Sequence, residues 1–202
     1  MWKMRSTLTQ LNKLSKKFYR RYRSELKDII VFGSVMRGKS DPKDLDVLML
    51  FKKKINKDIE YEFRKIASDV KNAAIISKTE NNYTDTSFDA REGVLFEGYS
   101  LIKNKLVSSE YGFTPLGLFV YQTQTLSNVK KTRFYYALNG RAASKGIVDM
   151  LDGLRLSDNL IAFPLNKIEA AKEFFNFWEL EYKYVPVLMP ERLARKNIIG
   201  KR

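Results

Sequence analysis

The sequence predicts an α+β protein with two domains. Segments with the period of an amphipathic helix are interspersed with short apolar segments typical of strands in both halves of the 202-residue chain. With 44% hydrophobic residues, 11 tyrosines and 13 phenylalanines, the chain has enough apolar side chains for a real core. A polar segment at residues 103–114, followed by Pro115, is expected to be a linker between the two domains.

The first domain is expected to span residues 1–102. A helix is predicted over residues 6–26, because apolar residues recur at spacings of three and four from Leu8 to Leu26. Short apolar runs predict strands at residues 29–32 and 45–51, and the segment between them is rich in turn-forming residues. The remaining predicted elements are a helix at 57–71, a strand at 73–76, a helix at 86–97 and a strand at 99–102.

The second domain is expected to be a small α+β domain over residues 115–190. Its predicted elements are a strand (116–126), a helix (128–139), a basic glycine-containing loop (139–146), a short helix (147–152), a strand (160–163), a helix (166–178) and a strand (180–189). Pro186 predicts that the last strand lies at a sheet edge, because proline cannot donate a ladder hydrogen bond. Residues 191–202 are expected to form a basic tail.

The composition excludes several kinds of chemistry. The chain has no cysteine and no histidine, which removes disulfides, thiolate metal sites and every imidazole base. Carboxylates, hydroxyls, amines and a hard metal ion remain available. The net charge of +14, from 37 lysines and arginines against 23 acidic residues, favours a polyanionic partner.

One stretch has a spacing that suits phosphate chemistry. Asp44 and Asp46 are two residues apart, so on a strand their carboxylates face one side, where a cation such as Mg²⁺ would relieve their repulsion. Gly33 lets the backbone approach a phosphate closely, and the Ser34 hydroxyl and the turn amides can donate to its oxygens. Gly38 lets the chain reverse toward the second strand. These features together predict phosphoryl transfer.

This stretch resembles the Gly-Ser and Asp-x-Asp signature of the DNA polymerase β nucleotidyltransferase superfamily, through Phe32-Gly33-Ser34, Gly38 and Asp44-Leu45-Asp46. Residues 91–96, Arg-Glu-Gly-Val-Leu-Phe, are similar to the minimal nucleotidyltransferase branch, and the resemblance covers residues from about 10 to 102. It implies a mixed sheet flanked by helices, with an NTP as donor. Asp44 and Asp46 would be the catalytic, Mg²⁺-binding carboxylates, and Gly33 and Ser34 would hold the triphosphate.

Two further aspects of the nucleotide site follow from the sequence. Arg37 and Lys39, in the same turn, are additional candidates for binding the nucleotide, where they would offset developing charge. Members of the superfamily often carry a third carboxylate on a later strand, where it helps to activate the acceptor hydroxyl. The matching residues 73–77 contain none, and Glu80, Asp85 and Asp89 lie beyond them. Metal and nucleotide binding are therefore expected, and the sequence leaves open whether catalysis is retained.

Three functions are consistent with these features. The first is an enzyme that transfers a nucleotidyl group from an NTP to a hydroxyl of a nucleic acid or a protein. The second is a catalytically inactive RNA-binding protein within a ribonucleoprotein such as the ribosome. The third is a component of a toxin–antitoxin pair, which the added second domain disfavours.

The RNA-binding alternative depends on cations with few acidic neighbours. Tyr19, Tyr22, Tyr135 and Tyr136 lie among them, where aromatic rings could stack on bases. The candidate RNA-binding residues are Lys13, Lys16, Lys17, Arg20, Arg21 and Arg23 near the N-terminus, Arg141 and Lys145 in the glycine-containing loop, and Arg195 and Lys196 in the tail. No apolar run approaches the ~20 residues that a membrane span needs, so a cytoplasmic protein without a membrane partner is expected.

Overall fold

The chain folds into two compact units. The computed structural model describes residues 6–39, 42–68, 70 and 72–194. The first unit comprises Met1–Met36 and Ser40–Val107, and the second comprises Arg37–Lys39 and Ser108–Arg202. The split after Val107 falls inside the segment expected to be a linker, which carries regular structure: β5 (Lys105–Leu106) and η1 (Ser108–Tyr111). Val107 ties this segment to the first unit, because it is buried in the same apolar cluster as Ile30 and Phe32.

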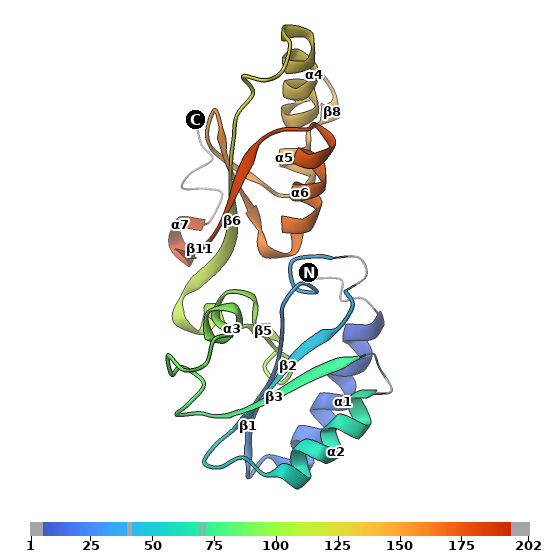
Figure 1. Ribbon diagram of the computed structural model, residues 1–202, viewed down its shortest axis with the longest axis vertical. Helices are drawn as coiled ribbons and strands as arrows, with labels where there is room; N and C mark the ends of the chain where they lie inside the picture. The colour runs from blue at the N-terminus through green and yellow to red at the C-terminus, as the bar shows by residue number, and fades with distance from the viewer. Residues whose placement is uncertain (1–5, 40–41, 69, 71, 195–202) are drawn as a thin grey trace. The chain divides into compact units, whose positions relative to one another are not determined.

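The first unit is a mixed sheet flanked by helices, as predicted, and the sheet has five strands. Its remaining elements are α1 (Ser6–Tyr22), β1 (Leu26–Phe32), β2 (Leu45–Phe51), α2 (Lys57–Ser68), β3 (Ala73–Thr79), α3 (Arg91–Glu97) and β4 (Tyr99–Ser100). The strand order is β3-β2-β1-β4-β5, with β2 antiparallel to β1 and parallel to β3. Figure 1 shows α1 and α2 together on one side of this sheet and α3 on the other.

Burial on both faces of the sheet sets the register of β2. Leu45, Val47 and Met49 are 0–1% exposed and point to one face. Leu48 points to the other face, into a cluster that includes Phe32. A slip of one residue would exchange the two faces and turn Asp46 into the core, so this packing determines where Asp46 lies.

Several boundaries of the first unit differ from the predicted ones. The helix predicted over residues 6–26 ends at Tyr22, and Leu26 instead begins β1, where it pairs with Phe51. The helix predicted from residue 86 begins at Arg91. Before it, the Asp85 carboxylate accepts a hydrogen bond from the Ser87 N–H at 2.8 Å, a local turn that competes with helix formation.

The second unit is built on a four-stranded antiparallel sheet of order β11-β6-β10-β9. Its elements after η1 are β6 (Phe113–Tyr121), α4 (Asn128–Asn139), β7 (Gly140–Arg141), β8 (Ser144–Lys145), α5 (Ile147–Met150), β9 (Leu154–Ser157), β10 (Leu160–Pro164), η2 (Leu165–Lys167), α6 (Ile168–Phe177), β11 (Tyr182–Pro190) and α7 (Glu191–Ala194). The strand that contains Pro186 lies at the edge, as predicted. Strand β9 was not predicted.

Aromatic packing joins the helices and the sheet of this unit. The Phe119 ring on β6 lies 5.3 Å from the Phe175 ring on α6, and the Tyr121 ring lies 5.6 Å from the Phe134 ring on α4. Within the described residues, no helix of either unit is long and apolar enough to cross a membrane.

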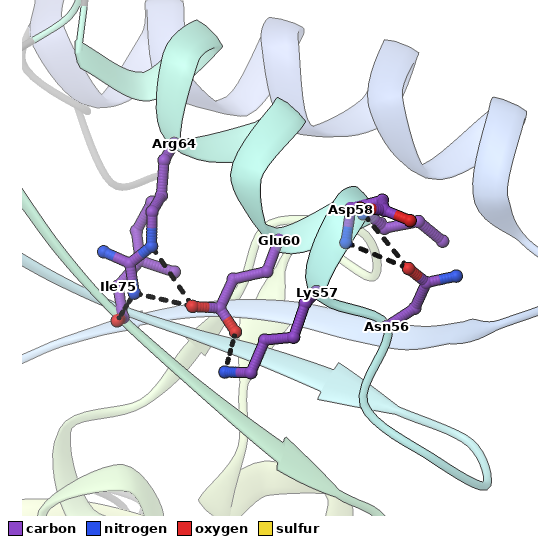
Figure 2. A network of polar contacts seen from close by, with 7 residues as sticks. Asn56, Lys57, Asp58, Glu60, Arg64 and Ile75 are labelled. Carbon is purple, nitrogen blue, oxygen red and sulfur yellow. Dashed lines mark hydrogen bonds and ion pairs between the residues drawn. The ribbon is translucent and has the colours of Figure 1, made fainter.

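The buried carboxylate of Glu60 on α2 binds Arg64, and Arg64 in turn donates a hydrogen bond to strand β3 (Figure 2). Arg64 donates to Glu60 Oε1 through Nε and Nη2, at 3.2 and 2.8 Å, and its Nη2 also donates to the Ile75 carbonyl at 2.6 Å. Lys57 Nζ donates to Glu60 Oε2 at 3.0 Å. Burial alone would raise the pKa of Glu60, but the hydrogen bonds from Arg64 and Lys57 outweigh it and lower the pKa from 4.5 to about 2.

We predict that Glu60→Gln removes a pH-dependent part of the stability of the first unit. Above pH 4.5 the wild-type carboxylate is ionised in both the folded and the unfolded chain, and its contribution is complete. As the pH falls from about 4.5 towards 2, the unfolded chain protonates first and the contribution is lost. The expected loss at neutral pH is on the order of 2 kcal/mol, discounted for the exposure of Arg64 and Lys57.

Urea denaturation at a series of pH values measures this effect. Glu92→Gln is the control, because the side chain of Glu92 is 83% exposed. The assignment is wrong if Glu60→Gln and the wild type lose stability in parallel below pH 4.5.

Candidate functional site

The structure brings four of the predicted site residues to one end of the β1–β2 pair. Gly33 and Ser34 directly follow β1, in a turn closed by the Met36 N–H donating to the Gly33 carbonyl at 3.0 Å. Phe32, the last residue of β1, pairs with Asp46 on β2. Asp46 is half-buried, whereas Asp44 is exposed and lies one residue before the strand begins.

The position of Gly33 disfavours any side chain. Its φ is +82°, a backbone conformation that residues with a Cβ rarely adopt. A Cβ added there would lie only 2.2 Å from Oδ2 of Asp46. The carboxylate of Asp46 thus occupies the space that the missing side chain leaves, directly beside the Gly33–Ser34 turn.

Ser34 provides a hydroxyl next to this carboxylate. Its side chain is half-buried and forms no hydrogen bond within the described part of the chain. The hydroxyl and the neighbouring turn amides are donors of the kind that phosphate oxygens accept. The arrangement therefore combines phosphate-binding groups with a carboxylate.

Arg37 and Lys39, also predicted to bind the nucleotide, group with the second unit. Nε of Arg37 donates to Oε1 of Glu169 at 3.1 Å, and the Glu169 N–H donates to the Arg37 carbonyl at 3.2 Å. Burial alone would raise the pKa of Glu169, but the hydrogen bonds from Lys172 and Arg37 prevail and lower it. Glu169 is a partner that sequence analysis missed, since it lies 132 positions from Arg37.

Beside Asp46, the neighbouring strand offers no carboxylate. The parallel register of β2 and β3 places Ala74 opposite Asp46, and Ala74 is exposed. No cluster of three or more acidic side chains that could hold a metal is found in the described residues. Two carboxylates still fit Mg²⁺, which is commonly held by one or two carboxylates together with waters and substrate phosphates.

The predicted RNA-binding cations differ in their surroundings. Lys13, Lys17 and Arg20 are exposed on α1 and have no acidic partner among the described residues. The other cations of this group are engaged or lie beyond the helix: Arg21 Nη1 is 2.7 Å from Glu62 Oε1, Lys16 Nζ donates to Asn104 Oδ1 at 2.8 Å, and Arg23 is exposed just after α1. Arg141 and Lys145 are exposed on β7 and β8, and Arg195 and Lys196 lie outside the described residues.

The tyrosines predicted to stack on bases are also in different environments. Tyr19 and Tyr135 are half-buried. The Tyr22 hydroxyl donates a hydrogen bond to Glu62, which raises the pKa of Tyr22. Tyr136 is 44% exposed and is the most accessible of the four.

We predict that Gly33→Ala destabilises the first unit by about 1–2 kcal/mol, because the methyl group meets Asp46 and the positive φ becomes strained. Adding Asp46→Ala should relieve the steric part of this destabilisation. The double variant should therefore lose less stability than the sum of the losses in the two single variants. Thermal unfolding measures each value. Gly93→Ala is the control, since a Cβ at Gly93 would meet nothing within 4 Å. If Gly33→Ala costs the same stability in the wild-type chain and in the Asp46→Ala variant, the predicted contact is wrong.

Comparison with protein-family models identifies the domain to which this geometry belongs. Residues 11–90 match the model of the nucleotidyltransferase domain. Searches of curated proteins and of solved structures found no match. The matched residues include β1, the Gly33–Ser34 turn, β2 with Asp46, and β3. Residues 11–90 of the first unit thus match a nucleotidyltransferase domain, and a further α+β region follows it.

Proposed function

We propose that the protein catalyses Mg²⁺-dependent transfer of a nucleotidyl group from an NTP to a hydroxyl of a nucleic acid. The observation that carries this proposal is the carboxylate of Asp46 against Gly33, beside the Ser34 hydroxyl. In the reaction, the acceptor oxygen forms a bond to the α-phosphorus of the NTP. The bond from that phosphorus to the bridging oxygen breaks, pyrophosphate leaves, and the hydroxyl proton passes to water.

Each residue of the site has a distinct role in the proposal. Asp44 and Asp46 hold the Mg²⁺, which when bound supplies positive charge against the triphosphate. The turn amides after Gly33 and the Ser34 hydroxyl hold phosphate oxygens. With Ala74 opposite Asp46, this strand supplies no carboxylate to accept the acceptor proton, so the protein accelerates the reaction through positioning and charge rather than through a base at this position.

A separate observation supports a second function, association with RNA. Helix α1 carries Lys13, Lys17 and Arg20 on its exposed side without acidic partners in the described residues, and none of its 17 residues is acidic. Such a helix attracts a phosphate backbone regardless of sequence. RNA association would be compatible with a role in a ribonucleoprotein and does not require catalysis.

Calorimetric titration with Mg²⁺ and each of the four ribonucleoside triphosphates tests the donor site. We expect the wild type to bind at least one NTP, and Asp44→Asn/Asp46→Asn to lose binding because the metal ligands are gone. Asp89→Asn, a change at an exposed aspartate of the same unit, should bind like the wild type. Asp46→Asn should also abolish incorporation of an α-labelled nucleotide into RNA while RNA binding persists. Absence of NTP binding by the wild type would refute the proposed activity.

RNA affinity measured against salt concentration tests the second function. Replacing Lys13, Lys17 and Arg20 by Gln should flatten the slope of log K against log salt by about 2 for single strands, since each neutralised phosphate contributes about 0.7. Lys53→Gln/Lys54→Gln, in the exposed loop before α2, is the control, which removes two cations away from α1 and should leave the slope unchanged. An unchanged slope in the α1 variant would rule out this helix as the RNA contact.

A further inference from the structure

We infer that the second unit carries a binding surface for single-stranded nucleic acid, centred on Tyr136 and Arg141. The surface is formed by α4 and the β7–β8 hairpin. It includes none of the residues proposed to bind the metal or the triphosphate. The inference therefore does not depend on the proposed transfer activity.

Helix α4 separates a core side from a charged side. Phe134 and Leu138 are fully buried, whereas Arg133 is exposed and Tyr136 is 44% exposed. The 12 residues of α4 include three cations, Lys130, Lys131 and Arg133, and no acidic residue. The ring of Tyr136 packs on no other aromatic ring in the described residues, unlike that of Phe134, and is left available at the surface.

The hairpin that follows α4 holds a guanidinium over this ring. The Arg141 Cζ lies 4.8 Å from the centre of the Tyr136 ring. Arg141 pairs with Ser144, whose Oγ donates to the Arg141 carbonyl at 2.7 Å. Gly140, with a φ of +89°, permits the tight approach, since a Cβ there would lie 2.3 Å from the Ser144 carbonyl oxygen. The backbone thus fixes the position of Arg141, and exposed Lys145 lies opposite Gly140.

This combination suits unpaired bases. A tyrosine ring and an arginine plane both stack on the faces of bases, and the surrounding cations contact the phosphates between them. The bases of a duplex are stacked inside the helix and do not present their faces to a protein ring. An anionic lipid headgroup would engage the cations but has no planar face for Tyr136.

A second tyrosine–cation pair shows why the charge of the neighbourhood matters. On α2, Lys65 Nζ lies 4.8 Å from the centre of the Tyr61 ring, and Tyr61 is 61% exposed. Its sequence neighbours on that helix include Asp58, Glu60 and Glu62, which repel phosphate. The Tyr61 pair has similar geometry without the cationic setting, which makes it a matched control.

Fluorescence anisotropy of the full chain with a labelled oligouridylate of about 12 nucleotides and a duplex of equal length tests the surface. Tyr136→Ala should weaken binding of the single strand by about 5- to 100-fold, the range expected for loss of one stacked base, and leave duplex affinity unchanged. Tyr136→Phe should retain single-strand affinity because it keeps the ring. Tyr61→Ala should bind like the wild type.

Several outcomes would overturn the inference. These are unchanged single-strand affinity in Tyr136→Ala, an equal loss for single strand and duplex, the same loss in Tyr61→Ala, or binding to vesicles of anionic phospholipid without binding to the oligonucleotide. Titration of Tyr136→Ala with Mg²⁺ and NTP keeps the two proposals apart. If Tyr136→Ala loses single-strand binding but binds NTP as the wild type does, the proposed surface is supported. If the wild type binds the single strand but no NTP, only the proposed donor site is refuted.

Discussion

The contact between the Asp46 carboxylate and the backbone of Gly33 is the constraint on which the candidate site depends. Gly33 leaves β1 with a positive φ and no side chain, and Oδ2 of Asp46 fills the space that a Cβ would need. The register that joins them is determined elsewhere, by Leu45, Val47 and Met49 buried on one face of β2 and Leu48 on the other. Apolar packing therefore positions a charged group that contributes little to the core itself.

Local sequence patterns predicted the bounds of those elements that have clear flanking signals. Residues 45–51 and 128–139 have the predicted bounds, because Asp44 and Lys52 flank the apolar strand, and Ser127 and Gly140 flank the helix. Leu26 did not follow its local pattern, since its spacing suits a helix face and only its pairing with Phe51 makes it a strand residue. Strand β9 was missed for the same reason, because Leu154–Ser157 is short and becomes a strand by pairing with β10.

In the site, too, the local sequence predicts some features, and others depend on residues far along the chain. Gly33, Ser34, Asp44 and Asp46 are separated by a single turn, so their spacing alone predicts that they meet at one end of a strand pair. Arg37 could be singled out by charge, but its carboxylate partner lies far along the chain, and no local pattern indicates it. Tyr136 and Arg141 were both recognised as candidates. Their stacking depends on a hairpin geometry that the glycine-containing loop suggests only in part.

Under the proposed function, the register of β2 and β3 separates nucleotide binding from acceptor activation in this domain. Holding the donor requires carboxylates and phosphate-binding groups, and the proposed ones lie on β2, directly before it or in the turn after β1. Activating the acceptor with a third carboxylate would require an acidic residue on β3, where Ala74 stands beside Asp46. Because the two requirements fall on different strands, the second can be absent while the first is intact. If the proposed activity holds, a chain of this kind would gain specificity for an acceptor chiefly by holding it, and cationic and aromatic surfaces outside the donor site would suit that task.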